Sequence, residues 1–527
     1  MLTRREFLKI GGTAAGAIII NPLSALSYPL KRTADYFTVH PFIEQNPDAV
    51  FIMRTDIDVK TNSEAVKKAG FVFGQSVFRL TDDDKIGVPL SHFFPIKPNL
   101  TSWAWDAPWG VDFEQVMGIV TDVYFVEGVI ESMKAIGINA EQLYIRDANG
   151  CENYDRAGYG AMGDRTGVDI QLGAQNPQLQ WVDVPEGVWF KRIPYLWPIN
   201  TPDSWLLNIA KLKAHGMGLT LSAKNLQGSI APSYVRHCSA WGASMGIDPE
   251  HIQPNAFDVI AENYSRHRDA GIPRWDVGGS DFTGGKGMET WVTRCLDNNS
   301  ILKPGLNVIE GIYGRDGNGF YQGPHNGVAQ DFMTNIIIFG KNTFYVDIIG
   351  KWLGGHEPGN FGLFHIAKER NFINTFNPIE IPLYEWNENG EATLSDLTNF
   401  ERTDLLTYYL TKPGEDKWHL CNEPYEYETS ITIDNTTNKP ESFILQQNYP
   451  NPFNTSTSIV FILPESGKTR LEIFNSRGEI VERIADGYYQ KGTHLAVWRN
   501  NNLPSGTYLY RLRFNSFNEI KKMILIK

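Results

Sequence analysis

The sequence predicts a layered α/β domain followed by a small all-β, immunoglobulin-like sandwich. In the middle of the chain, short apolar runs of strand type alternate with helical periodicity, an order that is typical of α/β layer proteins. In the last part, short strand-like runs are separated by turns rich in Gly, Asn and Pro, as in a β-sandwich. A polar stretch at 429–442 separates the two parts and is predicted to be a linker.

The elements of the middle part can be placed in order. Apolar residues recur on one face of a predicted helix over 120–136, and Gly137 ends it. Three short apolar runs, at 143–145, 206–210 and 306–309, are predicted strands. In α/β domains ligands gather at the carboxyl ends of such strands, so polar residues that follow the runs are candidate ligand contacts.

Composition excludes some classes of partner. The chain has 527 residues and a formal net charge of −12, which argues against a general nucleic-acid binder because phosphate binding relies on an excess of Lys and Arg. No segment after the first 27 residues is long and apolar enough to span a membrane. Four cysteines lack the C-x-x-C spacing of metal and redox sites, and both disulfides and free thiols remain open for them: Cys151, Cys238, Cys295 and Cys421.

The start of the chain has the features of an export signal. A charged start with Arg4 and Arg5, a short apolar stretch at 10–20 and small residues up to Ser27 make residues 1–27 a predicted signal peptide. The paired arginines followed by Phe-Leu-Lys resemble the twin-arginine signal. That resemblance implies the twin-arginine translocase as a partner and export of a folded protein, often one that already holds a cofactor.

Separated motifs at the end of the chain resemble one known sorting domain. Tyr-Pro-Asn-Pro-Phe-Asn stands at 449–454, Pro-Ser-Gly-Thr-Tyr at 504–508 and a Lys-bearing apolar segment at 521–527. Together they are similar to the type A sorting domain of the type IX secretion system, over 443–527. The resemblance implies passage across the outer membrane by that machinery, processing by its sortase, and attachment to the outer cell surface or release.

Three polar clusters mark the candidate site. Lys97 and Asn99 flank a proline and can offer a cation and an amide to an anion. A second cluster spans 208–228, where lysines suit a carboxylate or phosphate, a His can move a proton or bind a metal, and glycines allow close backbone approach. A glycine-rich stretch follows Glu310, directly after a predicted strand.

These clusters, in this order, resemble domain-of-unknown-function family 362. The motifs are Lys97-Pro98-Asn99, the string Lys-x-His at 213–215, and Lys-Asn-Leu-x-Gly at 224–228, with Asp347 similar to the family's last acidic position. The resemblance covers about 93–365, within a main domain predicted over 28–428. It implies a polar pocket for an anionic ligand or cofactor, in a family whose reaction is not settled.

The leading hypothesis is therefore an exported enzyme or cofactor protein with redox or proton-transfer chemistry next to a carboxylate. The sequence names neither the substrate nor the cofactor or metal. The alternative is a non-catalytic surface protein that binds glycans through Trp103, Trp105 and Trp109. In the leading hypothesis the predicted catalytic residues are Lys213, His215 and Asp347, and the predicted cofactor-binding residues are Lys97, Asn99, Lys224, Asn225, Gly228 and Glu310.

Overall fold

A computed structural model describes most of the chain as two compact units, Met1–Tyr427 and Glu428–Lys527. In the first unit the described residues are 35–100, 117–148, 157–172, 178–231, 249–277, 284–317, 323–328 and 330–427. In the second unit they are 443–445, 448, 451–453, 456–489, 491–499, 503–515 and 517–526. The predicted signal peptide, the predicted linker and the three tryptophans of the glycan hypothesis lie outside the described residues.

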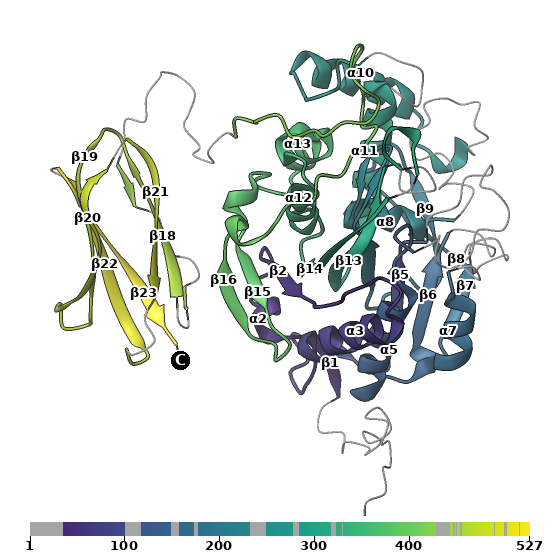
Figure 1. Cartoon of the computed structure of the whole chain (residues 1–527), viewed down its shortest axis with the longest axis horizontal. Coiled ribbons are helices and arrows are strands. Elements are labelled where there is room, and N and C mark those ends of the chain that lie inside the picture. The colour runs from purple at the N-terminus through teal and green to yellow at the C-terminus, as the bar shows by residue number, and fades with distance from the viewer. Residues whose placement is uncertain are drawn as a thin grey trace, which may run out of the picture. The chain divides into compact units, whose positions relative to one another are not determined.

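A nine-stranded mixed sheet forms the centre of the first unit (Figure 1). The five strands β13, β10, β5, β6 and β7 run parallel, whereas β14 is antiparallel to both of its neighbours. In order across the sheet the strands are β16 (Ala392–Ser395), β15 (Leu383–Trp386), β2 (Val50–Arg54), β14 (Gln330–Gly340), β13 (Leu306–Asp316), β10 (Leu207–Lys211), β5 (Phe94–Pro98), β6 (Leu143–Asp147) and β7 (Asp169–Leu172).

Helices cover both faces of this sheet, as Figure 1 shows for α3 and α5 on one face and α12 and α13 on the other. Side chains alternate between the two cores: Leu207 and Ile209 of β10 face the first, and Ala210 faces the second. The first core is closed by α3 (Ser63–Val77), α5 (Val123–Ala135) and α7 (Tyr159–Thr166), and the second by α8 (Ser222–Asn225), α11 (Gly285–Ile301), α12 (Thr343–Leu353) and α13 (Gly362–Glu369).

Smaller elements complete the unit. A three-stranded sheet and two hairpins flank the central sheet, and α10 packs on α11. Their bounds are β1 (Tyr36–Val39), β3 (Phe78–Thr81), β4 (Val88–Pro89), β8 (Leu179–Asp183), β9 (Arg192–Leu196), β11 (Lys213–His215), β12 (Gly218–Thr220), α2 (Pro41–Glu44) and α10 (Ala256–Asp269).

The predicted α/β architecture is confirmed, and one expectation within it is wrong. The predicted helix and the strand that ends at Asp147 appear as α5 and β6. The glycine-rich stretch after Glu310 does not follow a strand, because β13 continues through it to Asp316 and pairs with β14 across a bulge after Gly311. One of its glycines has a steric reason: a Cβ on Gly314 would lie 2.0 Å from the backbone oxygen of Leu212.

The second unit is the predicted all-β sandwich. Two antiparallel sheets, ordered β17-β18-β21 and β20-β19-β22-β23, share one apolar core that includes Trp498, Tyr510 and Phe461. The strands are β17 (Ile444–Leu445), β18 (Ser456–Leu463), β19 (Gly467–Phe474), β20 (Ile480–Tyr489), β21 (Gly492–Arg499), β22 (Gly506–Phe514) and β23 (Phe517–Leu525).

Candidate functional site

The candidate site lies where the strand order of the parallel sheet reverses. From β5 the chain passes outward to β6 and β7, then returns to place β10 on the other side of β5, with β13 beyond it. Such a reversal leaves a crevice at the carboxyl ends of the two central strands, where ligands of open α/β sheets bind. The residues at this edge come from β5, β6, β10 and β13.

Lys97 of β5 forms a buried ion pair with Asp147, the last residue of β6. The amine lies 2.6 Å from the carboxylate, and both side chains are 1% exposed. The same amine also donates to the backbone oxygen of Pro98 at 2.6 Å and to Asn225 Oδ1 at 3.2 Å. Burial lowers the pKa of Lys97, and the neighbouring Asp147 opposes this effect. Because its amine has three acceptors, Lys97 is held in one position and connects β5, β6 and α8.

A chain of buried asparagines connects the helix α8 to the two central strands. Asn225 of α8 donates to the backbone oxygen of Lys97 at 3.0 Å and to Asn208 Oδ1 at 2.8 Å. It also accepts from Asn99 Nδ2 at 3.1 Å. Asn208 in turn donates to Asn307 Oδ1 at 2.9 Å. Because the amides of Asn225 and Asn208 both donate and accept, the network fixes the orientation of the helix that carries Lys224.

Gly228 leaves space for the Lys97–Asp147 ion pair because it has no side chain. A Cβ at position 228 would lie 2.6 Å from Lys97 Cε, 2.7 Å from Lys97 Nζ and 3.2 Å from Asp147 Oδ2. The last residue of the Lys-Asn-Leu-x-Gly string therefore makes room for the ion pair. The predicted cofactor-binding residues Lys97, Asn99, Asn225 and Gly228 come together in one cluster, and they are largely occupied with one another.

A second buried ion pair joins β10 and β13. Lys211 lies 2.6 Å from Glu310, and neither side chain is exposed. Glu310 also accepts from the backbone amides of Asp122 and Ile312 at 3.2 and 3.1 Å, while the Lys211 amine lies 3.6 Å from the centre of the Tyr313 ring. Burial raises the pKa of Glu310, with Lys211 acting against it. Glu310 of β13 therefore links the carboxyl end of β10 to the start of α5.

The hairpin β11–β12 brings Lys213 and His215 to this edge. The two residues are separated by one position in a strand, so their side chains leave the same face. Lys213 is buried and donates to the backbone oxygen of Ile119, whereas His215 is partly exposed. Burial, followed by the nearby Lys224 amine, lowers the pKa of both groups well below their ordinary values. Lys213, His215 and Lys224 are therefore one electrostatic cluster.

Asp347 of α12 accepts hydrogen bonds from backbone amides at the start of α8. Its carboxylate accepts from the N–H groups of Ser222 and Ala223, at 2.6 and 2.9 Å, at the start of α8. Burial raises its pKa to about 7, and these hydrogen bonds act in the opposite direction. Asp347 thus positions the helix that carries Lys224 and Asn225.

Sequence reasoning missed three residues of this region. Asp147 and Lys211 are the ion-pair partners of Lys97 and Glu310, and a charged last residue on a short apolar strand is the signal that indicates each. Lys351 is fully buried in the apolar helix α12, with its amine 4.2 Å from the centre of the Phe361 ring. Burial lowers the pKa of Lys351 to about 8. A lysine one turn after Asp347 in a mostly apolar helix could have drawn attention to it.

Other candidate features do not add to the site. Within the described ranges, no group of three or more His, Cys, Asp or Glu side chains is arranged to hold a metal ion. Cys295 and Cys421 are buried free thiols, and the other two cysteines lie outside the described residues. Among the described residues, no helix is both long and apolar enough to cross a membrane.

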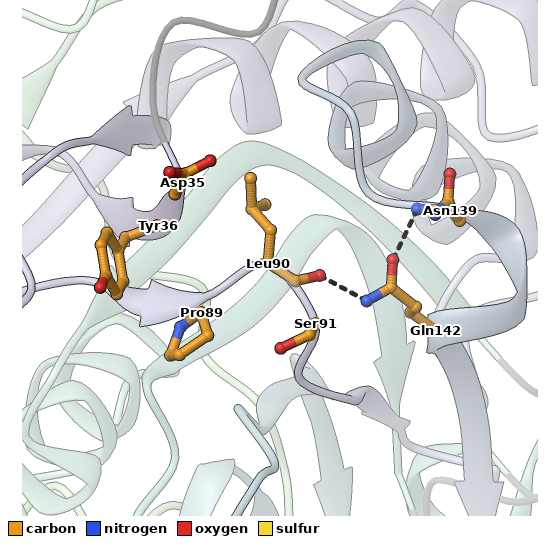
Figure 2. A pocket seen from close by; sticks show the side chains of 7 residues that line it. All are labelled: Asp35, Tyr36, Pro89, Leu90, Ser91, Asn139 and Gln142. Atoms are coloured by element: carbon orange, nitrogen blue, oxygen red, sulfur yellow. Dashed lines mark hydrogen bonds between the residues drawn. The ribbon is translucent and has the colours of Figure 1, made fainter.

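A separate hollow of about 550 Å³ lies near the amino end of β6, away from the candidate site (Figure 2). Its lining includes Gln142, which directly precedes β6 and donates to the backbone oxygen of Leu90. Since the candidate site stands at the carboxyl end of β6, this hollow is not part of it. Its lining residues are Asp35, Tyr36, Pro89, Leu90, Ser91, Asn139 and Gln142.

The structure thus defines an α/β unit with a polar cluster at a topological switch point, followed by an all-β unit. Residues 95–351 match the family model of a domain of unknown function, DUF362, and residues 447–527 match that of a secretion system C-terminal sorting domain. The DUF362 match runs from β5 to α12 and includes every predicted site residue. The sorting domain indicates export to the cell surface or secretion, with the type IX secretion machinery as a partner.

Other comparisons add little. No curated protein matches the chain. A crystal structure of dimeric latent PorU from Porphyromonas gingivalis is similar at 19% identity over 18% of this chain and 10% of that chain, with a TM-score of 0.14.

Proposed function

We propose that this exported protein is an enzyme that binds a small carboxylate anion at the switch point and moves a proton at the carbon next to the carboxylate. The observation that carries the proposal is the cluster of three basic side chains, Lys213, Lys224 and His215, at the carboxyl edge of β10. The charges that lower the pKa of Lys213 are those of Lys224, Lys211 and Arg315, with Asp147 as the opposing charge. Lys211 and Arg315 are paired with Glu310 and Asp331, so the positive charge that favours an anion beside Lys213 and His215 is that of Lys224.

The exposure of each side chain separates the residues that can contact a ligand from those that hold the site in place. Lys224 and His215 are partly exposed, whereas Lys97, Asn225 and Asp347 are buried and bonded to one another or to backbone groups. In the proposal, Lys224 therefore contacts the carboxylate of the ligand and His215 lies beside it. The buried residues hold α8 and the ends of the strands in place.

Lys213 is the proposed base. Burial and three nearby cations lower its pKa well below that of an exposed lysine, which favours the neutral amine. A neutral amine can donate to the backbone oxygen of Ile119 and still keep its lone pair for a proton. Buried lysines with lowered pKa values serve as bases in this way. Proton transfer is preferred over redox chemistry because these residues supply it without a further reactant.

Export completes the proposal. We place the protein at the cell surface or in the medium, as its sorting domain indicates, and propose that the twin-arginine translocase moves it across the inner membrane. Folding before export would allow the networks around Lys97 and Asp347 to form in the cytoplasm.

Hydrogen exchange at carbon tests the proposed chemistry. The full chain is incubated in deuterated water with a panel of 2-hydroxy acids, and proton NMR follows the signal of the hydrogen next to the carboxylate. At least one acid is expected to lose this signal with the wild type, and Lys213→Met is expected to abolish the loss. An unchanged exchange rate in Lys213→Met would remove Lys213 from the role of base.

A further inference from the structure

The ring of His215 is held by a contact within its own turn. His215 pairs with Gly218 across the hairpin β11–β12, so the turn contains two residues, Gly216 and Met217. The backbone N–H of Met217 donates to Nδ1 of His215 at 3.0 Å. Thr407 fixes the same turn from outside, because its hydroxyl donates to the backbone oxygen of His215 and accepts from the N–H of Gly218.

This contact decides which ring nitrogen carries the proton. A ring nitrogen that accepts a hydrogen bond uses its lone pair to do so and carries no proton. Because Nδ1 of His215 is the acceptor, the proton of the neutral ring is on Nε2. Desolvation and the amines of Lys224 and Lys213 lower the pKa of His215 well below its usual value, which favours the neutral ring. The group that His215 presents beyond its turn is therefore an Nε2–H donor.

The same contact argues against two other roles of His215. A histidine that binds a metal commonly donates its second ring N–H to an acceptor, whereas the second nitrogen of His215 receives a hydrogen bond from Met217. A general base needs a ring nitrogen with an available lone pair, and here Nδ1 is engaged and Nε2 is protonated. Both roles would require the ring to break its bond to the turn.

We propose that His215 is a neutral hydrogen-bond donor to the ligand oxygen that gains negative charge during proton transfer, and that this oxygen belongs to the carboxylate of the ligand. This inference rests on the proposed function. Lys213 and His215 leave the same face of β11, and Lys224 acts electrostatically on both. The three groups thus suit one carbon with its attached carboxylate: a base for the C–H bond, a cation for the carboxylate and a donor for the developing oxyanion.

The step is balanced without a further reactant. The C–H bond next to the carboxylate breaks and its proton moves to the neutral Lys213 amine. The electron pair of that bond forms a carbon–carbon double bond to the carboxylate carbon, and the displaced π pair moves onto a carboxylate oxygen, giving an enediolate. That oxygen accepts the hydrogen bond from His215, and Lys224 offsets the added charge. Return of the proton, or of a deuteron from solvent, reverses the step.

The first test reads the tautomer in the full chain without any ligand. Nitrogen-15 NMR of histidine-labelled protein is recorded from about pH 5 to pH 8, the range in which an ordinary histidine changes its charge. The His215 signals are assigned by their loss in His215→Gln. The proposal predicts an unprotonated Nδ1 and a protonated Nε2 throughout this range. A protonated Nδ1 with an unprotonated Nε2 would overturn it.

The second test compares two probes in binding calorimetry: glycolate, which has only the ground-state carboxylate, and glycolohydroxamate, whose planar oxygen pair resembles the enediolate. A group that acts on the developing charge improves binding of the second probe more than of the first. His215→Leu, which has no donor, is expected to weaken glycolohydroxamate roughly tenfold or more and to leave glycolate nearly unchanged. His215→Gln keeps one acceptor for Met217 and one donor for the ligand, and is expected to retain most of the affinity.

The outcomes separate this inference from the proposed function. If His215→Gln loses as much glycolohydroxamate affinity as His215→Leu, the donor role is wrong even though the anion site stands. If neither probe binds the wild type, the proposed anion site is wrong, and the tautomer measurement still decides the state of the ring. Equal losses for both probes in His215→Leu would contradict a role specific to the developing charge.

Discussion

Gly228 lies against the end of Lys97, so that a Cβ at position 228 would fall 2.6 Å from Lys97 Cε and 2.7 Å from its amine. The glycine belongs to the segment that follows α8, and the lysine to β5. Their contact joins two of the sequence motifs into one structural unit, because it leaves space for the Lys97–Asp147 ion pair.

Gly228→Ala is predicted to destabilise the first unit by about 1–3 kcal/mol, since an added methyl group in a packed interior forces neighbouring atoms to move. It should also weaken ligand binding, because the displaced amine disturbs Asn225 and thus the helix that carries Lys224. Urea denaturation measures the first effect. Gly216→Ala is the matched control: its Cβ would lie 3.4 Å from the nearest atom, Tyr408 Cδ2, and stability near that of the wild type is expected.

The buried pair of Lys97 and Asp147 gives a second prediction. Asp147→Leu leaves an uncompensated buried amine and is expected to cost about 3–5 kcal/mol of unfolding free energy. Lys97→Met combined with Asp147→Leu removes both charges and should recover a large part of that loss. A double-mutant cycle in urea measures the coupling. Simple additivity of the two single losses would show that the pair does not form.

The sequence motifs carried information about which residues lie near one another in this region. The strings around Lys97, Lys213 and Lys224 indicated one site, and the structure brings them to one edge of the sheet. The sheet order itself could not be predicted, since local patterns do not say which strands become neighbours. For the same reason Asp147 was recognised as the end of a strand but not as the partner of Lys97.

The roles of individual residues were harder to predict than their proximity. Asp347 was predicted to be catalytic, and the structure directs its carboxylate at the amides of Ser222 and Ala223. Glu310 was predicted to bind a cofactor, and it pairs with Lys211. A sequence shows that a carboxylate is present, but the group that it meets depends on the tertiary packing of α8 and β10.

Asp347 predicts a specific pH dependence. Its pKa rises from an ordinary value of 3.8 to about 7 in the folded chain, so the folded state binds this proton more tightly than the unfolded state does. Its contribution to the unfolding free energy is therefore greatest below about pH 4 and falls as pH rises to about 7, by up to about 4 kcal/mol. Asp347→Asn does not titrate, so its stability relative to the wild type should increase over this window.

Urea denaturation at a series of pH values checks this difference. Asp347→Ala provides the comparison, because it leaves two buried amides without their acceptor and should be less stable than Asp347→Asn at every pH. A constant difference between the wild type and Asp347→Asn across the window would show that Asp347 is not titrating there.

The paired arginines predict the export route. Replacing Arg4 and Arg5 by lysine keeps the charge of the signal but removes the pair that resembles the twin-arginine motif. Cell fractionation should then find the protein retained in the cytoplasm, whereas Lys31→Arg, beyond the predicted signal, should be exported normally. Normal secretion of the double variant would instead indicate a general-secretory signal.

The central claim is that the switch-point cluster binds an anion through Lys224, and calorimetry with glycolate measures this directly. The account predicts that Lys224→Gln, in the full chain, weakens binding roughly tenfold, as expected for a lost charged hydrogen bond. Lys68→Gln, on an exposed face of α3, should bind as the wild type does. Equal affinities for the wild type and Lys224→Gln would contradict the account.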